Sequence, residues 1–363
     1  MPVEHVFCGL CGLSGVALFE HIRSVHKIDI AEYERQCPHA PLFSASFGRF
    51  VAENGLRRDA GGVTMTRSLF GVDVSSGVLP DEHVPPVDEN YAFDEKISRN
   101  LLLSLVENDR ILLVGATGCG KSSLIVQLAA RANWPLRKIN LHGETSVSDL
   151  VGQWVVDAKE MKFRYGVLPT AMKAGQILVL EEIDGAEPAV LFVLQGVMEE
   201  NGLLILTENG GEIVRPHPRF RIVATANTLG LGDETGLYAG THVLNAAHLD
   251  RWTVVFNMSY LPEDREESLL AAKVPQLERK TAKTLVKLAN AVRKAAEQEQ
   301  VFCTFSTRRL LFLAAKAVSL GSVRDALELT VLNKLAKNDR QVVYEIAQRH
   351  MPGIEAAPSG GAS

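Results

Sequence analysis

Short apolar runs alternate with amphipathic stretches through the middle of the chain. Five of these runs predict β-strands, and the residues between them carry apolar positions at the spacing of helices. Strands that alternate with helices are typical of a parallel α/β sheet. The predicted strands span residues 110–114, 137–141, 177–181, 221–226 and 253–257.

The pattern changes at Pro262. From there to about residue 350 the apolar positions follow helical spacing, which predicts a small all-α domain behind the α/β domain. A helix is also expected at 93–107, directly before the first strand. The C-terminal helices are predicted at 282–300, 307–320 and 323–337.

The N-terminal part differs from both domains. Gly61-Gly62 and the stretch from Pro80 to Pro86 interrupt any long element, so this region is expected to be a linker that wraps the next domain. The tail is rich in Gly, Ala, Pro and Ser, which predicts disorder. The expected organisation is a small module at 1–40, a linker at 41–92, an α/β domain at 93–261, a helical domain at 262–352 and a disordered tail at 353–363.

Composition places the chain among globular proteins. With 363 residues, 46% of them apolar and 22% charged, more than one domain is expected. The net charge of −5 argues against a broadly basic surface for nucleic acid. The sequence has no apolar run long enough to cross a bilayer and five scattered cysteines, so we expect a cytoplasmic protein without a membrane partner.

A phosphate-binding loop follows the first predicted strand. The sequence matches G-x-x-x-x-G-K-[ST] and leads into a predicted helix at 123–133. Successive backbone N–H groups in such a loop converge on phosphate, and the helix N-terminus adds positive potential. Lys121 is expected to reach the β- and γ-phosphates of ATP, and the Ser122 hydroxyl to ligate Mg²⁺. The candidate nucleotide-binding residues are Gly115, Ala116, Thr117, Gly118, Cys119, Gly120, Lys121, Ser122 and Ser123.

Polar residues follow two other predicted strands. Glu181 and Glu182 end the strand at 177–181, where carboxylates lie beside the phosphate loop. We expect Glu181 to act as the acid that holds the Mg²⁺ ion and Glu182 to act as the general base toward water. The alternative is that the two glutamates only form a solvated strand edge. Asn227 follows the strand at 221–226 and is expected to orient that water.

Two arginines are candidates for stabilising charge on the transferring phosphate. Arg251 follows Asp250 and is a candidate arginine finger, supplied across a subunit boundary; the alternative is a surface ion pair with Asp250. Arg308 opens a predicted helix and could reach the phosphates from the helical domain, with Arg309 as the competing choice.

The first forty residues contain a candidate zinc site. Cys8, Cys11, His21 and His26 form a complete set of two thiolates and two imidazoles for Zn²⁺, with both histidines on a helix predicted from Ser14. So small a module would fold through the metal. The spacing resembles that of the prokaryotic Ros/MucR-type Cys2His2 zinc finger. Cys37 and His39 are the alternative ligands.

The partner of this finger stays open at the level of sequence. Arg23 and Lys27 give its helix only a thin basic face, and Glu20 reduces it further. Fingers that bind phosphate usually carry more Lys and Arg. Protein docking or a structural role is therefore favoured over contact with nucleic acid, which remains the alternative.

Together these motifs resemble the AAA+ ATPases of the MoxR/magnesium-chelatase clade, and most closely the CobS-type subunits of aerobic cobaltochelatase. The likeness covers roughly residues 66–350 and is most specific over 224–262. The stretches that carry it are Asn133-Trp134-Pro135, Asp149-Leu150-Val151-Gly152, Gly166-Val167-Leu168-Pro169, 215–221, Ala224-Thr225-Ala226-Asn227-Thr228, 230–238, Asp250-Arg251-Trp252 and Tyr260-Leu261-Pro262.

The resemblance implies an AAA+ P-loop domain followed by a helical lid, in a ring of subunits that is usually a hexamer with ATP at each interface. It assigns the sensor asparagine to Asn227, the arginine finger to Arg251 and the lid sensor to Arg308. It also implies a partner with a von Willebrand factor A-type (vWA) domain. Two predicted hairpins, at 153–164 and 203–214, would approach the pore and the client; the alternative is that they are decorative.

Three features depart from the clade. Glu181 stands where the clade usually has Asp, Cys119 lies inside the phosphate loop, and the zinc finger is an addition. The favoured hypothesis is an ATP-driven ring motor acting on a partner, including a metal-chelatase subunit. One alternative is a DNA-associated ATPase. Its zinc finger would bind DNA, and ATP would act as a switch for its assembly. Another is a nucleotide-binding scaffold that hydrolyses ATP poorly because of Glu181.

Overall fold

The computed structural model describes most of the chain after residue 56. The described ranges are 57–59, 62–77, 81–157, 160–228, 240–243 and 245–351, with isolated positions elsewhere. The predicted zinc ligands Cys8, Cys11, His21 and His26, the alternative ligand His39 and the predicted tail at 353–363 lie outside the described residues.

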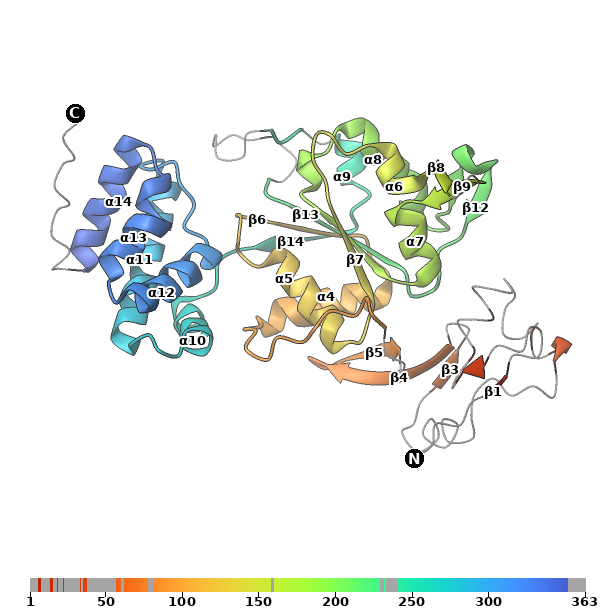
Figure 1. The fold of residues 1–363 in the computed structure, drawn as a ribbon, viewed down its shortest axis with the longest axis horizontal. Helices are drawn as coiled ribbons and strands as arrows, with labels where there is room; N and C mark the ends of the chain where they lie inside the picture. The colour runs from red at the N-terminus through yellow and green to blue at the C-terminus, as the bar shows by residue number, and fades with distance from the viewer. Residues whose placement is uncertain are drawn as a thin grey trace.

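The centre of the protein is a five-stranded parallel sheet (Figure 1). Its strands run in the order β14-β6-β13-β10-β7, and each predicted strand is confirmed within a residue or two. The first strand in sequence, β6, therefore lies between β14 and β13, and its phosphate loop emerges near the middle of the sheet. The strands are β6 (Ile111–Gly115), β7 (Leu136–Asn140), β10 (Ile177–Glu181), β13 (Arg221–Ala226) and β14 (Val254–Met258).

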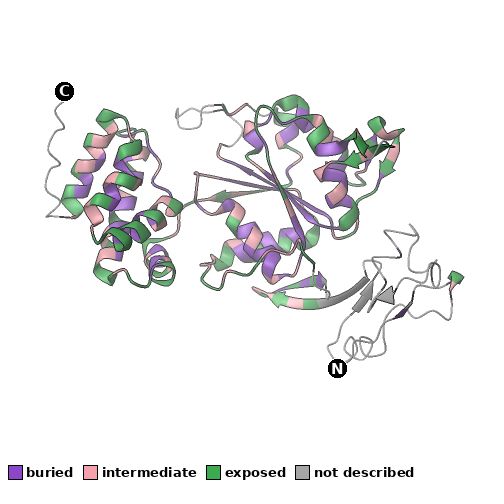
Figure 2. Cartoon of the chain, viewed as in Figure 1, coloured by how far each residue is buried: buried purple, intermediate pink, exposed green. Residues whose placement is uncertain are grey.

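The central strands of the sheet, β6, β13 and β10, are buried on both faces (Figure 2). In β6, Leu112 and Val114 pack into one hydrophobic core, while Ile111 and Leu113 pack into a second core on the opposite face. Because successive side chains of a strand point to opposite faces, a strand covered on both sides needs an unbroken apolar run. This explains why β6, β10 and β13 lack alternation of apolar and polar residues.

Helices cover the two faces of the sheet (Figure 1). Asp94 caps α4 by accepting a hydrogen bond from the Ile97 N–H at 2.9 Å, and the helix ends at Asn108 in the left-handed region. One face carries α4 (Glu95–Glu107) and α5 (Lys121–Arg131); the other carries α6 (Val147–Val151), α7 (Val167–Ala174) and α8 (Pro188–Met198), with the short α9 (Ala246–Leu249) before β14.

The C-terminal helices form a separate bundle beside the sheet domain, with its own core (Figure 1). The single helix predicted at 323–337 is wrong: it stops at Thr330, and a 3-10 turn at Leu332–Lys334 precedes the last helix. Val331 leaves helical geometry because its side chain and that of Leu332 are buried in the bundle core. The helices are α10 (Glu263–Lys273), α11 (Arg279–Glu297), α12 (Thr307–Leu320), α13 (Val323–Thr330) and α14 (Lys337–His350).

Two β-hairpins project from the sheet domain, as predicted. β8 (Gly152–Asp157) pairs with β9 (Glu160–Tyr165), and β11 (Leu204–Leu206) pairs with β12 (Glu212–Val214). They lie beside α7 at the edge of the molecule far from the helical bundle (Figure 1). Short 3-10 turns follow β10 at Ile183–Gly185 and β11 at Thr207–Asn209.

The segment expected to be a linker contains a small antiparallel sheet. It consists of β3 (Arg57–Asp59), β4 (Gly62–Leu69) and β5 (Val72–Gly77), and Val72 and Val74 of β5 pack beneath α4 and α5. Near the N-terminus, β1 (Val6–Phe7) pairs with β2 (Ser14–Gly15), so the helix predicted from Ser14 is wrong at its start. The described helices include none with both the length and the apolar character that crossing a bilayer requires.

Candidate active site

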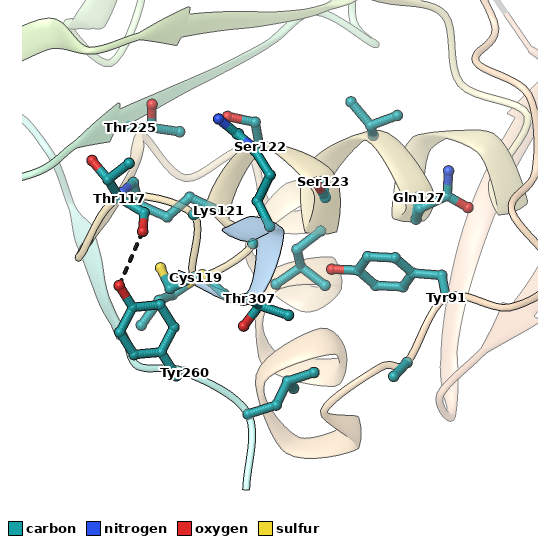
Figure 3. Close-up of a pocket in the computed structure, with 18 of the residues that line it drawn as sticks. Tyr91, Thr117, Cys119, Lys121, Ser122, Ser123, Gln127, Thr225, Tyr260 and Thr307 are labelled. Atoms are coloured by element: carbon teal, nitrogen blue, oxygen red, sulfur yellow. Dashed lines mark hydrogen bonds between the residues drawn. The ribbon is translucent and has the colours of Figure 1, made fainter. Parts of the chain in front are cut away.

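A pocket of about 780 Å³ lies between the phosphate loop, the carboxyl ends of the sheet strands and the helical bundle. Figure 3 shows the loop residues Thr117, Cys119 and Lys121 facing Thr225 and Tyr260, with Gln127 further along α5 and Tyr91 on the segment beside it. The pocket brings together most of the residues that the sequence singled out. Those that line it are Thr117, Gly118, Cys119, Gly120, Lys121, Ser122, Ser123, Glu181, Glu182, Asn227 and Arg308.

The phosphate loop depends on two glycines. Gly118 and Gly120 have φ angles of +70° and +103°, which residues with a side chain rarely adopt. A Cβ at Gly118 would also lie 2.5 Å from the Cβ of Ser306, so the helical bundle approaches the loop as closely as glycine permits. The loop is therefore shaped for backbone contact with an anion at the start of α5.

Lys121 is held at the centre of the loop. Its Nζ donates hydrogen bonds to the carbonyls of Gly115 (2.5 Å) and Ala116 (3.2 Å) and to Oδ1 of Asn227 (3.0 Å). Burial lowers the pKa of Lys121 from its ordinary value, because desolvation disfavours the ammonium. The carboxylates of Asp184 and Glu182 act in the opposite direction. The negative charge of a bound triphosphate would offset this desolvation and stabilise the ammonium.

The two acids at the end of β10 both line the pocket but differ in conformation. Glu182 has φ +57°, a left-handed conformation that is uncommon for a non-glycine residue and that tends to mark functional sites. Its N–H donates to Oγ1 of Thr225 at 3.2 Å, which ties the turn to β13. Glu181 lies 3.8 Å from Nζ of Lys138, a residue of β7 that sequence analysis did not single out.

Asp184 organises the end of β13. It is fully buried, and its Oδ2 accepts hydrogen bonds from the N–H groups of Asn227 and Thr228, both at 2.9 Å, and from the Thr228 hydroxyl at 3.0 Å. Asn227 is thereby fixed beside the phosphate loop. Sequence analysis assigned Asp184 no role, although its place two residues after the paired glutamates was the available signal.

The arginine candidates separate in space. Arg308 lines the nucleotide pocket from the start of α12 and also a second cavity, whereas Arg309 lines the second cavity and is not among the residues of the first. Arg251 is not among the pocket residues in the described part of the chain. It pairs with Glu199 at 3.2 Å and donates to the Ala247 carbonyl at 2.7 Å, so its ion-pair partner is Glu199 instead of the Asp250 considered from the sequence.

The pocket is also lined by apolar and aromatic residues that the sequence analysis did not single out. Tyr91 and Ile97 lie on the sheet-domain side, and Leu269 and Leu311 come from the helical bundle. Burial raises the pKa of Tyr91, so its hydroxyl stays protonated. An ion pair between Asp88 and Lys273 joins the two sides of the pocket. The pocket therefore offers both polar groups at the phosphate loop and apolar side chains further along, the mixture typical of small-molecule sites.

Cys119 is buried within the loop. Burial is the main cause that raises the pKa of its thiol, and the ammonium of Lys121 opposes this only in part. Because the thiolate is the reactive form of cysteine, the raised pKa favours a packing role over oxidation sensitivity.

Family comparisons agree with this architecture. The model of the AAA domain (dynein-related subfamily) matches residues 110–242, and the model of the CbbQ/NirQ/NorQ C-terminal region matches residues 266–349. The first covers the phosphate loop and four of the five sheet strands, β6, β7, β10 and β13, and the second covers most of the helical bundle. Residues of both matched regions line the pocket, which therefore lies between them.

Individual relatives extend the match over most of the chain. The aerobic cobaltochelatase subunit CobS of Sinorhizobium sp is 38% identical over 301 residues, which is 80% of this chain and 90% of the relative. The putative chaperone BssE of Thauera aromatica is 28% identical over 278 residues, covering 75% and 91%. Among solved structures, a putative ATPase from Cytophaga hutchinsonii matches with a TM-score of 0.38 and 18% identity, covering 70% of this chain and 88% of that one.

Proposed function

We propose that this chain, which belongs to the MoxR-like AAA+ ATPases in the family of CobS, hydrolyses ATP in the pocket at the end of its parallel sheet and uses the energy to drive a partner. The main support for the proposal is that residues from distant parts of the chain come together in one pocket. The phosphate loop, Glu182, Asn227 and Arg308 come from four distant segments of the chain and line one pocket.

Each of these residues has a role that its position supports. Glu182 takes a proton from the attacking water as the water oxygen bonds to the γ-phosphorus and the bond to the β-phosphate oxygen breaks. Asn227, fixed by Asp184, orients the water. Lys121 and Arg308 stabilise the charge that develops on the phosphate oxygens.

A magnesium ion fits the residues present. The hydroxyl of Ser122 and the carboxylate of Glu181 line the same pocket and are oxygen donors of the kind that Mg²⁺ prefers. When bound, the ion would neutralise phosphate charge and fix the orientation of the triphosphate. Glu181 is one methylene longer than the Asp usual in the clade, so we propose that it holds the ion through water.

We propose that the active unit is a ring, with six subunits as the favoured number. Arg251 pairs with the exposed Glu199 and is not among the residues that line its own pocket, as expected for a residue that acts on a neighbouring subunit. A head-to-tail ring places one such surface against the pocket of the next subunit. Each site would then be completed by Arg251 of the neighbour.

The two hairpins are the proposed contact with the client. Nε1 of Trp154 in β8 donates to the Glu208 carbonyl at 2.7 Å, which joins the hairpins into one unit. Val156 and Met161 near the tip of the first hairpin are 76% and 67% exposed, and exposed apolar clusters mark interaction surfaces. A vWA-domain protein is the proposed partner; a metal-chelatase role, such as cobalt insertion into a corrin, is one form of this function.

The zinc site is a separate proposal, because its ligands lie outside the described residues. Cys8, Cys11, His21 and His26 would hold one Zn²⁺ ion. Metal analysis of the purified protein tests this: we expect about one zinc per chain, lost in Cys8→Ser and retained in Cys303→Ser. Equal zinc content in wild type and Cys8→Ser would reject it.

ATP hydrolysis is tested by comparing wild type with Glu182→Gln. We expect wild type to release phosphate from ATP, and the variant to bind a fluorescent ATP analogue with unchanged affinity while its turnover falls by about 10²-fold or more. Glu297→Gln, at the exposed end of α11, is the matched control and should keep wild-type turnover. Equal, near-zero turnover of wild type and Glu182→Gln would reject the motor and favour a binding scaffold.

A further inference from the structure

The helical bundle contains a buried ion pair close to the nucleotide pocket. Nη1 and Nη2 of Arg293 in α11 each lie 2.8 Å from an oxygen of Glu266 in α10. Glu266 is fully buried, and Arg293 is 7% exposed. The pair is bidentate, which is the strongest and most directional form of this interaction.

This ion pair holds the start of α12. The hydroxyl of Thr307 donates to Oε1 of Glu266 at 2.5 Å, and Nε of Arg293 donates to the Phe305 carbonyl at 2.8 Å. Thr307 directly precedes Arg308, which lines the pocket. The geometry of the ion pair therefore fixes the backbone from which the Arg308 side chain extends.

The same ion pair is also connected to the phosphate loop, through Tyr260. The guanidinium of Arg293 lies over the ring of Tyr260, 3.9 Å from its centroid, a cation–π contact. The Tyr260 hydroxyl donates to the Thr117 carbonyl at 3.1 Å, the bond drawn in Figure 3. Thr307 also lies close to Cys119 of the loop in the same view. The loop is thus held by two arms that share one buried ion pair.

The contacts close into a circuit through Ser306. Its side chain packs against Gly118 so tightly that a Cβ at that glycine would lie 2.5 Å away. Movement of the phosphate loop would therefore push on the start of α12 and pull on Tyr260 together. Since a buried ion pair adds little net stability compared with apolar residues of similar volume, its geometry is the feature that needs explaining.

We propose that Tyr260, Glu266, Arg293 and Thr307 are positioning residues that set the distance between Arg308 and the phosphate loop during hydrolysis. Tyr260 and Thr307 line the pocket, whereas Glu266 and Arg293 are not among its lining residues; the role proposed for all four is exerted through Arg308 and the loop. The inference rests on the proposed function, because it concerns turnover at the same site. Its chemical consequence is specific: loss of one arm should misplace Arg308 in the transition state while leaving ATP binding nearly intact.

Two near-isosteric variants test the arms separately. Thr307→Val removes the hydroxyl that bonds Glu266, and Tyr260→Phe removes the hydroxyl that bonds Thr117 but keeps the ring over Arg293. We expect each variant to lower kcat by about tenfold to a hundredfold with little change in KM for ATP. Thr284→Val, which loses only a local bond within α11, is the matched control and should keep wild-type kcat. The melting temperature reports whether folding is affected.

A double-mutant cycle separates positioning from a purely structural effect. If Thr307 acts through Arg308, Thr307→Val should cost nothing further in an Arg308→Ala background. Wild-type kcat in both single variants, or the same loss of kcat with and without Arg308, would overturn the proposal. Failure of the proposed function is distinguishable, because then wild type itself would hydrolyse no ATP.

Discussion

The ammonium of Lys121 and the side-chain amide of Asn227 are hydrogen-bonded, with 3.0 Å between Nζ and Oδ1. The hydroxyl of Thr117 donates to the same oxygen at 3.3 Å. The residue proposed to bind phosphate and the residue proposed to orient water are therefore coupled across the pocket. A triphosphate that draws Lys121 toward itself would release the amide of Asn227 toward the attacking water.

This coupling makes a prediction about Asn227→Ala. We expect kcat to fall by about 10²-fold, because the water loses its orienting group, while the affinity for ATP stays equal to or tighter than wild type. The affinity is preserved because Lys121 no longer has to leave a hydrogen-bond partner. Steady-state turnover and titration with a fluorescent ATP analogue measure the two effects. Asn333→Ala, on the surface of the helical bundle, serves as the control, and a variant that loses binding instead of turnover would contradict the assignment.

The affinity for ATP should decrease as the pH rises through the alkaline range. Burial lowers the pKa of Lys121 in the free protein, so the ammonium is lost at a lower pH than that of an ordinary lysine, about 10.4. Binding of the anionic triphosphate favours the ammonium. Affinity is therefore full below the lowered pKa and declines as the pH rises through it. Titration of a fluorescent ATP analogue from pH 7.5 to 10 measures the decline.

Lys121→Arg is the matched variant for this titration. A guanidinium stays charged over the whole range, so we expect weaker but nearly pH-independent binding. Two results would count against the interpretation: a flat profile in wild type, or the same decline in wild type and Lys121→Arg.

Asp184 should contribute to both stability and turnover. Asp184→Ala would leave three part-buried donors of residues 227 and 228 without their acceptor, so we expect a loss of about 3 kcal/mol in the free energy of unfolding and a strong loss of kcat. Asp184→Asn keeps one acceptor oxygen and should cost about 1–2 kcal/mol. Denaturant unfolding and turnover of the two variants check this order; equal effects would argue against a hydrogen-bonding role.

Lys138 should compete with Mg²⁺ for Glu181. The two side chains form an ion pair at 3.8 Å, and exposed pairs of this kind are worth roughly 0.2–1 kcal/mol. We expect Lys138→Met to lower the Mg²⁺ concentration needed for half-maximal turnover by about two- to fivefold. Lys287→Met, on the exposed face of α11, is the control. A Mg²⁺ requirement that does not change would show that Glu181 is free to bind the ion in wild type.

The elements with strong local signals could be predicted from the sequence. The five sheet strands are apolar runs that both faces of the fold require, and the loop at 115–122 has glycines where the backbone demands them. The hairpin at 204–214 follows from its Asn-Gly turn signal. The convergence of Glu182, Asn227 and Arg308 followed from their places at strand and helix ends.

The rest depended on contacts between segments distant in sequence. The break after Thr330 arises because Val331 and Leu332 enter the bundle core, which no local pattern reveals. Lys138 becomes a neighbour of Glu181 only because β7 pairs with β10. The hydrogen bond between Tyr260 and Thr117 joins residues 143 positions apart in the sequence, so neither position signals it alone. Such long-range contacts hold the pocket residues in place, and they become visible only in the folded structure.

The placement of Arg251 leads to a prediction about assembly. If the pocket of one subunit is completed by Arg251 of the next, Arg251→Ala and Lys121→Ala subunits should each be inactive alone and regain activity when mixed. A site in the mixed ring is intact when an unaltered Lys121 faces an unaltered Arg251, so an equal mixture should recover about a quarter of wild-type turnover. Size-exclusion chromatography with one subunit type labelled confirms that mixed rings form. Mixed rings that stay inactive would mean that Arg251 acts within its own subunit or only through its ion pair with Glu199.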